Sequence, residues 1–157
     1  VVYALTQTGR YRVTLMDGST QMGSFQVEVT PGTASSAAST LTLGAGQGDA
    51  TERLALVANE EIPVEVVLKD EYGNNVDYSL RAEDKVAVAL RLADTEDAAA
   101  DTDVPTALLY NNATGTFSGT VRRSMAGAYV ATLVLNGAEV GTVSADFDLR
   151  VGGVDPL

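Results

Sequence analysis

The stretch Gly127–Val151, GAYVATLVLNGAEVGTVSADFDLRV, decides the fold. It opens on a glycine, alternates apolar and small residues, turns at Asn136-Gly137, and alternates again up to Val151. An Asn-Gly pair between two alternating runs is the strongest short-range signal for a β-hairpin. The sequence therefore predicts two antiparallel strands joined by a tight turn.

A near copy of this stretch, Gly9–Val29 (GRYRVTLMDGSTQMGSFQVEV), stands at the other end of the chain. The matched pairs are Gly9 with Gly127, Tyr11 with Tyr129, Thr14-Leu15 with Thr132-Leu133, Gly18 with Gly137, and Phe25-x-Val27-x-Val29 with Phe147-x-Leu149-x-Val151. The copies lie about 118 to 122 positions apart. Because solenoid units are only about 20–50 residues long, this spacing indicates whole domains in series.

Length and composition set the scale of the fold. The 157 residues, 45% of them apolar, allow one domain of about 100–150 residues plus a remnant. No run approaches the roughly 18 apolar residues of a membrane-spanning helix. The first residues, Val1-Val2-Tyr3, show no signal-peptide pattern, so we expect a fragment of a longer chain whose targeting segment lies elsewhere.

Charge and residue types exclude several classes of function. The net charge of −11 argues against nucleic acid and against anionic membrane surfaces, which both select basic proteins. The chain has no Cys and no His, which excludes disulfides, Cys/His zinc sites and Ser-His-Asp or Cys-His catalysis within it. We expect no cofactor and no enzymatic activity.

Short alternating segments broken by Gly, Asn, Asp and Pro run through the chain, and none keeps a helical apolar period. Predicted strands are Val1–Thr8 (as a strand end), Arg10–Met16, Phe25–Val29, Thr40–Leu43, Arg53–Ala58 (a strand or one helical turn), Ile62–Lys69, Val86–Leu92, Thr106–Tyr110, Thr116–Arg123 and the closing hairpin. Thr33–Thr40 is interpreted as a linker or a lead-in to the next strand. This pattern predicts an all-β, two-sheet antiparallel β-sandwich of the immunoglobulin-like kind, with seven strands.

Two segments resemble a filamin-type immunoglobulin-like repeat. Leu54–Asn75 is similar to its opening, an apolar segment leading into a strand that ends in Lys-Asp before a Gly/Asn turn. Ala107–Leu133 is similar to its strongest segment, through Asn111-Asn112, Gly115-Thr116-Phe117 and Gly127-Ala128-Tyr129. Bacterial invasin-like modules share the Asp-x-Tyr-Gly-Asn turn.

The resemblance implies a division of the chain into two parts. It covers about Ser39–Val151 as one complete repeat, while Val1–Val29 resembles the last three strands of a preceding repeat. We therefore expect residues 1–32 to be the end of a preceding repeat plus a short linker, and residues 33–157 to be a complete repeat.

Two groups of oxygen-bearing side chains are candidate cation sites. The acidic residues of the first are Asp94, Glu96, Asp97, Asp101 and Asp103, in the loop Ala93–Asp103. Ca²⁺ binding or a solvated acidic loop would both explain them, although the spacing is not that of an EF-hand. The second group is Asp70, Glu71, Asn74 and Asn75, which turn chemistry alone explains. We assign no metal to either group.

Three residues suggest structural roles or a site of modification. Tyr11 and Tyr129 each follow a strand-opening glycine by two positions, as in a tyrosine corner, where the hydroxyl bonds to nearby backbone. Asn112 begins an Asn-Ala-Thr glycosylation sequon in a predicted turn, to be used only if the protein enters the secretory pathway.

The resemblance also implies a partner-binding edge, because the corresponding strands bind peptides in several filamin repeats. Strand addition would use unpaired backbone groups for affinity and alternate side chains for specificity. The candidate residues are Val86, Val88, Leu90, Leu92, Leu108 and Tyr110. An ordinary protected edge is the alternative.

We therefore expect a non-catalytic structural or adhesive module, a spacer and protein-interaction scaffold within a larger multi-repeat protein. Its expected partners are neighbouring repeats and a peptide at a sheet edge. The alternative is an accessory module of an extracellular enzyme whose catalytic domain lies elsewhere. The compartment stays open between the cell surface, slightly favoured, and the cytoplasmic cytoskeleton.

Overall fold

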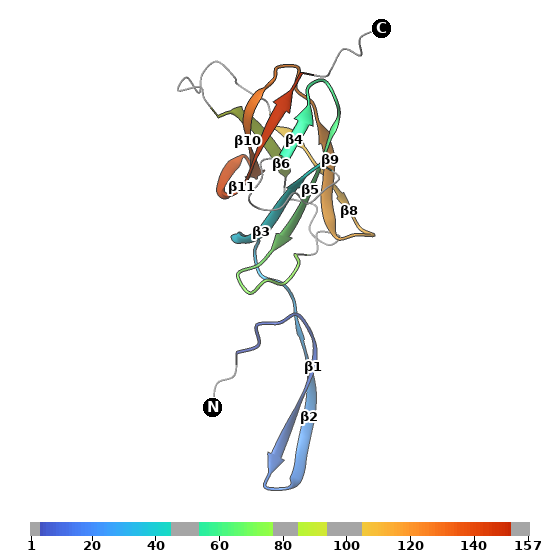
Figure 1. The fold of residues 1–157 in the computed structure, drawn as a ribbon. Helices are drawn as coiled ribbons and strands as arrows, with labels where there is room; N and C mark the ends of the chain where they lie inside the picture. Colours follow the sequence, from blue (N-terminus) through green and yellow to red (C-terminus); the bar gives the residue numbers. More distant parts are fainter. Residues whose placement is uncertain (1–3, 45–53, 77–84, 94–104, 152–157) are drawn as a thin grey trace.

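The computed structural model describes residues 4–44, 54–76, 85–93 and 105–151 (Figure 1). All the regular elements in these residues are β-strands, and they form sheets of two, four and five strands. No helix in the described ranges has the length and apolarity needed to cross a membrane. The all-β prediction is confirmed.

The N-terminal hairpin, strands β1 (Gly9–Asp17) and β2 (Thr20–Val29), forms an antiparallel sheet of its own. It projects from one end of the remaining strands (Figure 1). Gly18 opens its two-residue turn with a φ of 59°, a conformation that glycine adopts without strain. The predicted strand at Val1–Thr8 is wrong for residues 4–8, which are not extended strand, and residues 1–3 lie outside the described part.

The other two sheets form the sandwich. The four-stranded sheet contains, in order, β3 (Ser35–Leu43), β5 (Ile62–Lys69), β9 (Thr116–Val121) and β8 (Leu109–Asn111). The five-stranded sheet contains, in order, β4 (Leu54–Val57), β11 (Ala138–Arg150), β10 (Gly127–Leu135), β6 (Val86–Leu92) and β7 (Thr106–Ala107). Every pair is antiparallel except β11 with β4, which is parallel. The predicted two-sheet immunoglobulin-like sandwich is confirmed, with nine described strands where seven were expected.

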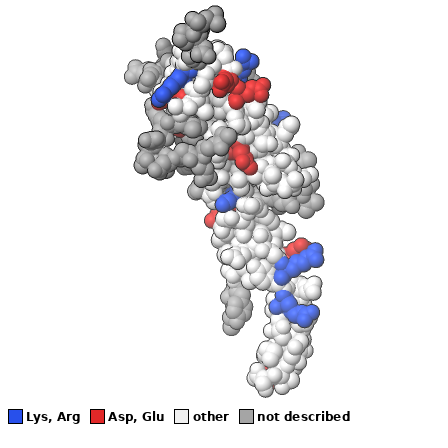
Figure 2. Space-filling view, turned by 45° about the vertical axis from the view of Figure 1, so that its right-hand side comes forward, with Lys and Arg blue, Asp and Glu red and all other residues white. Residues whose placement is uncertain are grey.

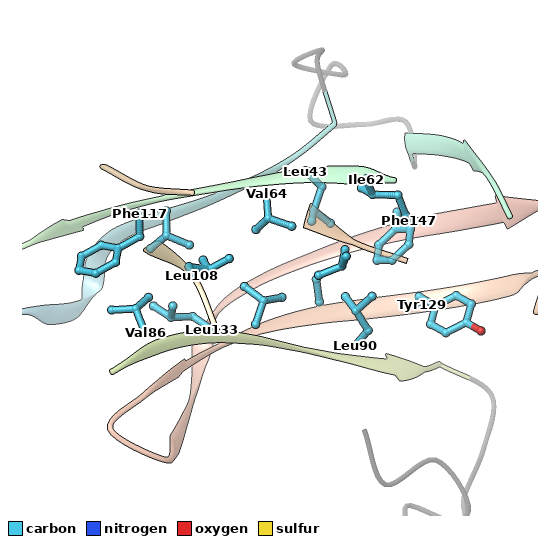
Figure 3. Close-up of a cluster of buried hydrophobic side chains, with 14 of the residues drawn as sticks. Leu43, Ile62, Val64, Val86, Leu90, Leu108, Phe117, Tyr129, Leu133 and Phe147 are labelled. Atoms are coloured by element: carbon cyan, nitrogen blue, oxygen red, sulfur yellow. The ribbon is translucent and has the colours of Figure 1, made fainter. Parts of the chain in front are cut away.

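The core lies between these two sheets (Figure 3). Strand β5 follows the expected alternation, with Ile62, Val64, Val66 and Leu68 all buried. The facing sheet contributes its own buried side chains, among them Leu90, Tyr129, Leu133 and Phe147. Because each such side chain contributes about 1.5–3 kcal/mol when fully buried, this alternation is what stabilises the sandwich.

Two segment assignments differ from the prediction. The single strand expected at Thr106–Tyr110 is broken at Leu108, where the chain passes from β7 in one sheet to β8 in the other. The buried side chain of Leu108 fills the space between the sheets at this crossing. The segment Thr33–Thr40 is mostly strand, because β3 begins at Ser35 and pairs with β5 across an irregular register up to Thr40.

The two hairpins repeat one another in register over the six pairs nearest their bases, from Gly9 to Thr14 and from Gly127 to Thr132. Tyr11 pairs with Val27, and Tyr129 pairs with Phe147. Val27 is therefore the equivalent of Phe147, and the sequence alignment that matched Phe25 to Phe147 is wrong by two positions. The reason is that the two hairpins have bulges of different size. The second strand has one unpaired extra residue in β2 and three in β11, which shifts its alignment by two positions.

The inner faces of the two hairpins differ in burial. Leu133 is 1% exposed in the sandwich core, whereas its equivalent Leu15 is 55% exposed. Phe25, Met16 and Met22 are also exposed on the N-terminal hairpin. Most of the visible hairpin surface carries no charge (Figure 2). The N-terminal hairpin therefore has the apolar face of a sandwich hairpin without the sheet that would cover it.

Candidate functional site

The turn Asp70–Asn75, called the junction turn below, follows β5 and is built around one carboxylate. Asp70 Oδ1 accepts hydrogen bonds from the backbone N–H groups of Tyr72 (3.0 Å) and Asn74 (2.9 Å). The Asp70 N–H donates to the Asn74 carbonyl (2.9 Å), and Gly73 N–H donates to the Asp70 carbonyl (3.0 Å). These bonds explain the Asp-x-Tyr-Gly-Asn sequence, because an Asp side chain can organise its own turn.

The junction turn also holds both ends of the N-terminal hairpin. Asn74 Nδ2 donates to the Thr6 carbonyl (2.7 Å), and Asn74 Oδ1 accepts from the Thr8 N–H (3.1 Å). On the other side of the hairpin, in the segment after β2, the Gly32 N–H donates to Asp70 Oδ2 (3.0 Å). Since the hairpin shares no sheet with the sandwich, these side-chain bonds join its base to the sandwich in addition to the chain segment between β2 and β3.

The surroundings of Asp70 favour the ionised form of its carboxyl group. Its side chain is 2% exposed, and burial by itself raises the pKa of a carboxyl. The hydrogen bonds from the Asn74 side chain and from the N–H groups of Gly32, Asn74 and Tyr72 outweigh burial and hold the pKa of Asp70 below its ordinary value. A second bond pair, from Asn74 Nδ2 to both Asp70 oxygens (3.1 and 2.9 Å), orients the amide toward the hairpin.

Gly73 is needed for the shape of the junction turn, because its φ of 83° is one that side-chain-bearing residues rarely adopt. We expect Gly73→Ala to lower the free energy of unfolding by roughly 1–2 kcal/mol, the cost of a left-handed conformation for an L-residue. Chemical denaturation would measure it. The control is Gly23→Ala in β2, where an added Cβ meets nothing within 4 Å. Equal effects from both substitutions would contradict the special role of Gly73.

The predicted tyrosine corners are confirmed in both hairpins. The Tyr11 hydroxyl donates to the Gln7 carbonyl (2.9 Å), and the Tyr129 hydroxyl donates to the Met125 carbonyl (3.1 Å). Each bond spans four positions and fixes the segment that enters the first strand of its hairpin. The same segment in the N-terminal copy carries the groups that Asn74 binds.

The residues predicted for a partner-binding edge lie mostly in the core. Val86, Val88, Leu90 and Leu108 are buried, Leu92 is half-buried, and Tyr110 packs on Phe117 with ring centroids 5.0 Å apart. The side chains of Val86, Val88, Leu90 and Leu108 face the opposing sheet, so they are not exposed to supply specificity to an added strand. Among the described residues, β7 pairs with β6 only at Ala87 and Val88. Strand addition at the edge near Val86–Leu92 stays a prediction that rests on the backbone groups of β6. Full protection of the β6 amides from hydrogen exchange would contradict it.

The remaining candidates are placed as follows. Asn112 is exposed in the turn before β9, where Ala113 N–H donates to Asn111 Oδ1 (2.9 Å), so a glycan at Asn112 stays a prediction. The acidic candidates Asp94, Glu96, Asp97, Asp101 and Asp103 lie outside the described residues. In the ranges that are described, no three Asp, Glu, His or Cys side chains gather as a metal site would require.

Sequence reasoning missed Thr6, Thr8 and Gly32 as contact residues. They act through backbone groups, which carry no residue-type signal, and they lie 38 to 68 positions from their partners. The one available signal was the repeat itself, which marks where one hairpin ends and the next domain begins.

Comparison with known proteins agrees with the fold. A profile of the family He_PIG, described as "Putative Ig domain", matches residues 57–152. The solved structure of FdeC, an adhesin of Escherichia coli, is similar with a TM-score of 0.52 and 23% identity over 93% of this chain. This chain spans 42% of the length of that adhesin chain. The Lin-41 filamin domain is similar with a TM-score of 0.47 and 15% identity, over 76% of this chain and 98% of that one. A search of curated proteins returned no significant match.

Proposed function

Because the chain belongs to the immunoglobulin-like family He_PIG, described as "Putative Ig domain", we propose that it is a non-catalytic module of a larger multi-module protein. It would act as a spacer and as a scaffold for protein contacts, structural or adhesive. Its partners would be the neighbouring modules of the same chain.

The N-terminal hairpin is the observation that carries this proposal. It repeats the closing hairpin of the sandwich in sequence and, over the six pairs nearest its base, in register, yet the position of the buried Leu133 is taken by the exposed Leu15. A hairpin with this apolar face is stable when other strands cover it. We therefore assign residues 1–32 to the closing strands and linker of a preceding immunoglobulin-like module, and residues 33–157 to one complete module.

Residues 33–157 expressed alone provide the test. All strand pairs of the sandwich lie between Ser35 and Arg150, so we expect this piece to unfold in one cooperative transition. Its midpoint in thermal denaturation should be close to that of the full chain, since the strand pairs of the sandwich are all retained. A piece that fails to unfold cooperatively would count against separate modules.

A further inference from the structure

The bonds at the junction turn show how one module holds the hairpin before it. Asn74 presents a side-chain amide that accepts from Thr8 N–H and donates to Thr6 C=O, as the C=O and N–H of a single residue do in a parallel pair of strands. Asp70 holds the segment after β2 at Gly32. Both ends of the hairpin are thereby fixed to one turn, which sets the direction in which the hairpin leaves the sandwich.

The tyrosine corner explains why Thr8 presents its N–H group to Asn74. Tyr11 binds the Gln7 carbonyl on one side of the entering segment. Thr8 N–H belongs to the same peptide group as the Gln7 carbonyl, and the two groups of a trans peptide point in opposite directions. Thr8 N–H therefore points away from Tyr11 and donates to Asn74, which also binds Thr6 C=O.

The sandwich carries the same arrangement at its opposite end. When β1 is aligned with β10, the segment Ser124–Ala126 takes the positions of Thr6–Thr8. Tyr129 binds the Met125 carbonyl, as Tyr11 binds the carbonyl of Gln7. Ser124, Met125 and Ala126 are all exposed, with Met125 at 63%.

Strand pairing shows that this segment is far from the junction turn. Val121, just before it, pairs with Ile62 at the start of β5, whereas the junction turn follows Lys69 at the end of β5. The module therefore has a binding turn at one end and the groups that such a turn binds at the other.

We propose that Ser124–Ala126 is the docking surface for the junction turn of a following immunoglobulin-like module. The proposal rests on the modular function argued above. The occupant is a turn of the Asp70–Asn75 kind, whose amide side chain bonds Ser124 C=O and Ala126 N–H. Gly152, which the second-strand offset matches to Gly32, lies outside the described residues and is not needed for the assignment.

A tandem protein tests this surface. Residues 1–152 are followed directly by a second copy of residues 33–157, because the repeat places residue 152 at the position of Gly32, which precedes residue 33 in the natural chain. Because the chain has no Cys, Ser118→Cys in each copy gives a unique pair of spin labels on exposed strand positions. Pulsed electron paramagnetic resonance then gives the distribution of distances between the two spin labels.

We expect a narrow distribution, because the docked turn fixes one sandwich relative to the other. Asn74→Ala in the second copy should abolish the narrow peak, and Asn75→Ala at the exposed neighbouring amide should leave it unchanged.

The outcomes separate the two proposals. The docking surface is overturned if the label-to-label distances in the parent tandem are broadly distributed, or if their distribution stays narrow after Asn74→Ala. In either case two folded modules remain. A second copy that does not unfold cooperatively overturns the modular assignment itself. The natural chain supplies the reference: with labels at Ser19→Cys and Ser118→Cys, Asn74→Ala should broaden the distance between hairpin and sandwich in the same way.

Discussion

Leu133→Ala is expected to lower the free energy of unfolding by about 2–5 kcal/mol, the range for a Leu truncated in a packed core. Leu133 is 1% exposed on β10 and belongs to the cluster between the two sheets. The substitution removes apolar contacts and leaves a cavity that the close-packed neighbours fill only in part. Urea denaturation of the full chain at neutral pH measures the loss.

The matched control is Leu15→Ala, the same change at the equivalent position of the N-terminal hairpin. Because Leu15 is 55% exposed, we expect a change within about 0.5 kcal/mol of the parent, as for surface substitutions generally. Comparable losses from the two substitutions would show that the hairpin face is already covered and would contradict the fold described above. In a longer protein that supplies the preceding strands, Leu15→Ala should become as costly as Leu133→Ala.

Asp70→Asn is expected to change the dependence of stability on pH. The pKa of Asp70 is lowered in the folded protein relative to its ordinary value of 3.8, so the ionised carboxylate stabilises the fold above that value. This stabilisation is lost as pH falls through the lowered folded pKa. Asp70→Asn removes the charge and replaces one acceptor oxygen by a donor, so the variant should be less stable at neutral pH and lose less stability on acidification. Thermal midpoints measured from about pH 6 down to about pH 2 would show the two curves converging.

Glu71→Gln provides the control for Asp70. Glu71 is the adjacent carboxyl of the same turn but is exposed, and the backbone bonds that build the turn go to Asp70. Its removal should leave the acid profile close to that of the parent. If Glu71→Gln flattened the profile as much as Asp70→Asn, the stabilisation would be a general effect of charge near the turn and not the hydrogen-bonded carboxylate.

The sequence carried enough information for the fold because its strands alternate. Ile62, Val64, Val66 and Leu68 have period two, and all four face the core. Asn136 and Gly137 form the hairpin turn with φ values of 53° and 84°, as an Asn-Gly pair predicts. These signals are local, so they can be interpreted without knowing which strands pair.

What could not be predicted depends on tertiary pairing. The break at Leu108 could not be predicted, because the residues before it pair in one sheet and those after it pair in the other. The sequence pattern of the segment does not change at the break. The two-position error in matching the hairpins arises because a bulge shifts register without a distinctive sequence. At the predicted edge, alternation identified Val86, Val88 and Leu90 as one face of a strand but gave no reason to choose between core and groove.

The parallel pairing of β4 with β11 has a mechanical consequence for a module in series. Residues Phe147–Arg150 of the last strand pair with Leu54–Val57 alongside, and β10 flanks β11 on its other side. Tension applied through the end of β11 acts along the strand, so these bonds are loaded together in shear. The N-terminal hairpin is loaded differently, because Gly9 and Val29 are partners at its open base and would be pulled apart one pair at a time. In the proposed chain of modules this hairpin is the β10–β11 pair of a closed sandwich, so a neighbouring strand like β4 would load its second strand in shear and oppose this unzipping.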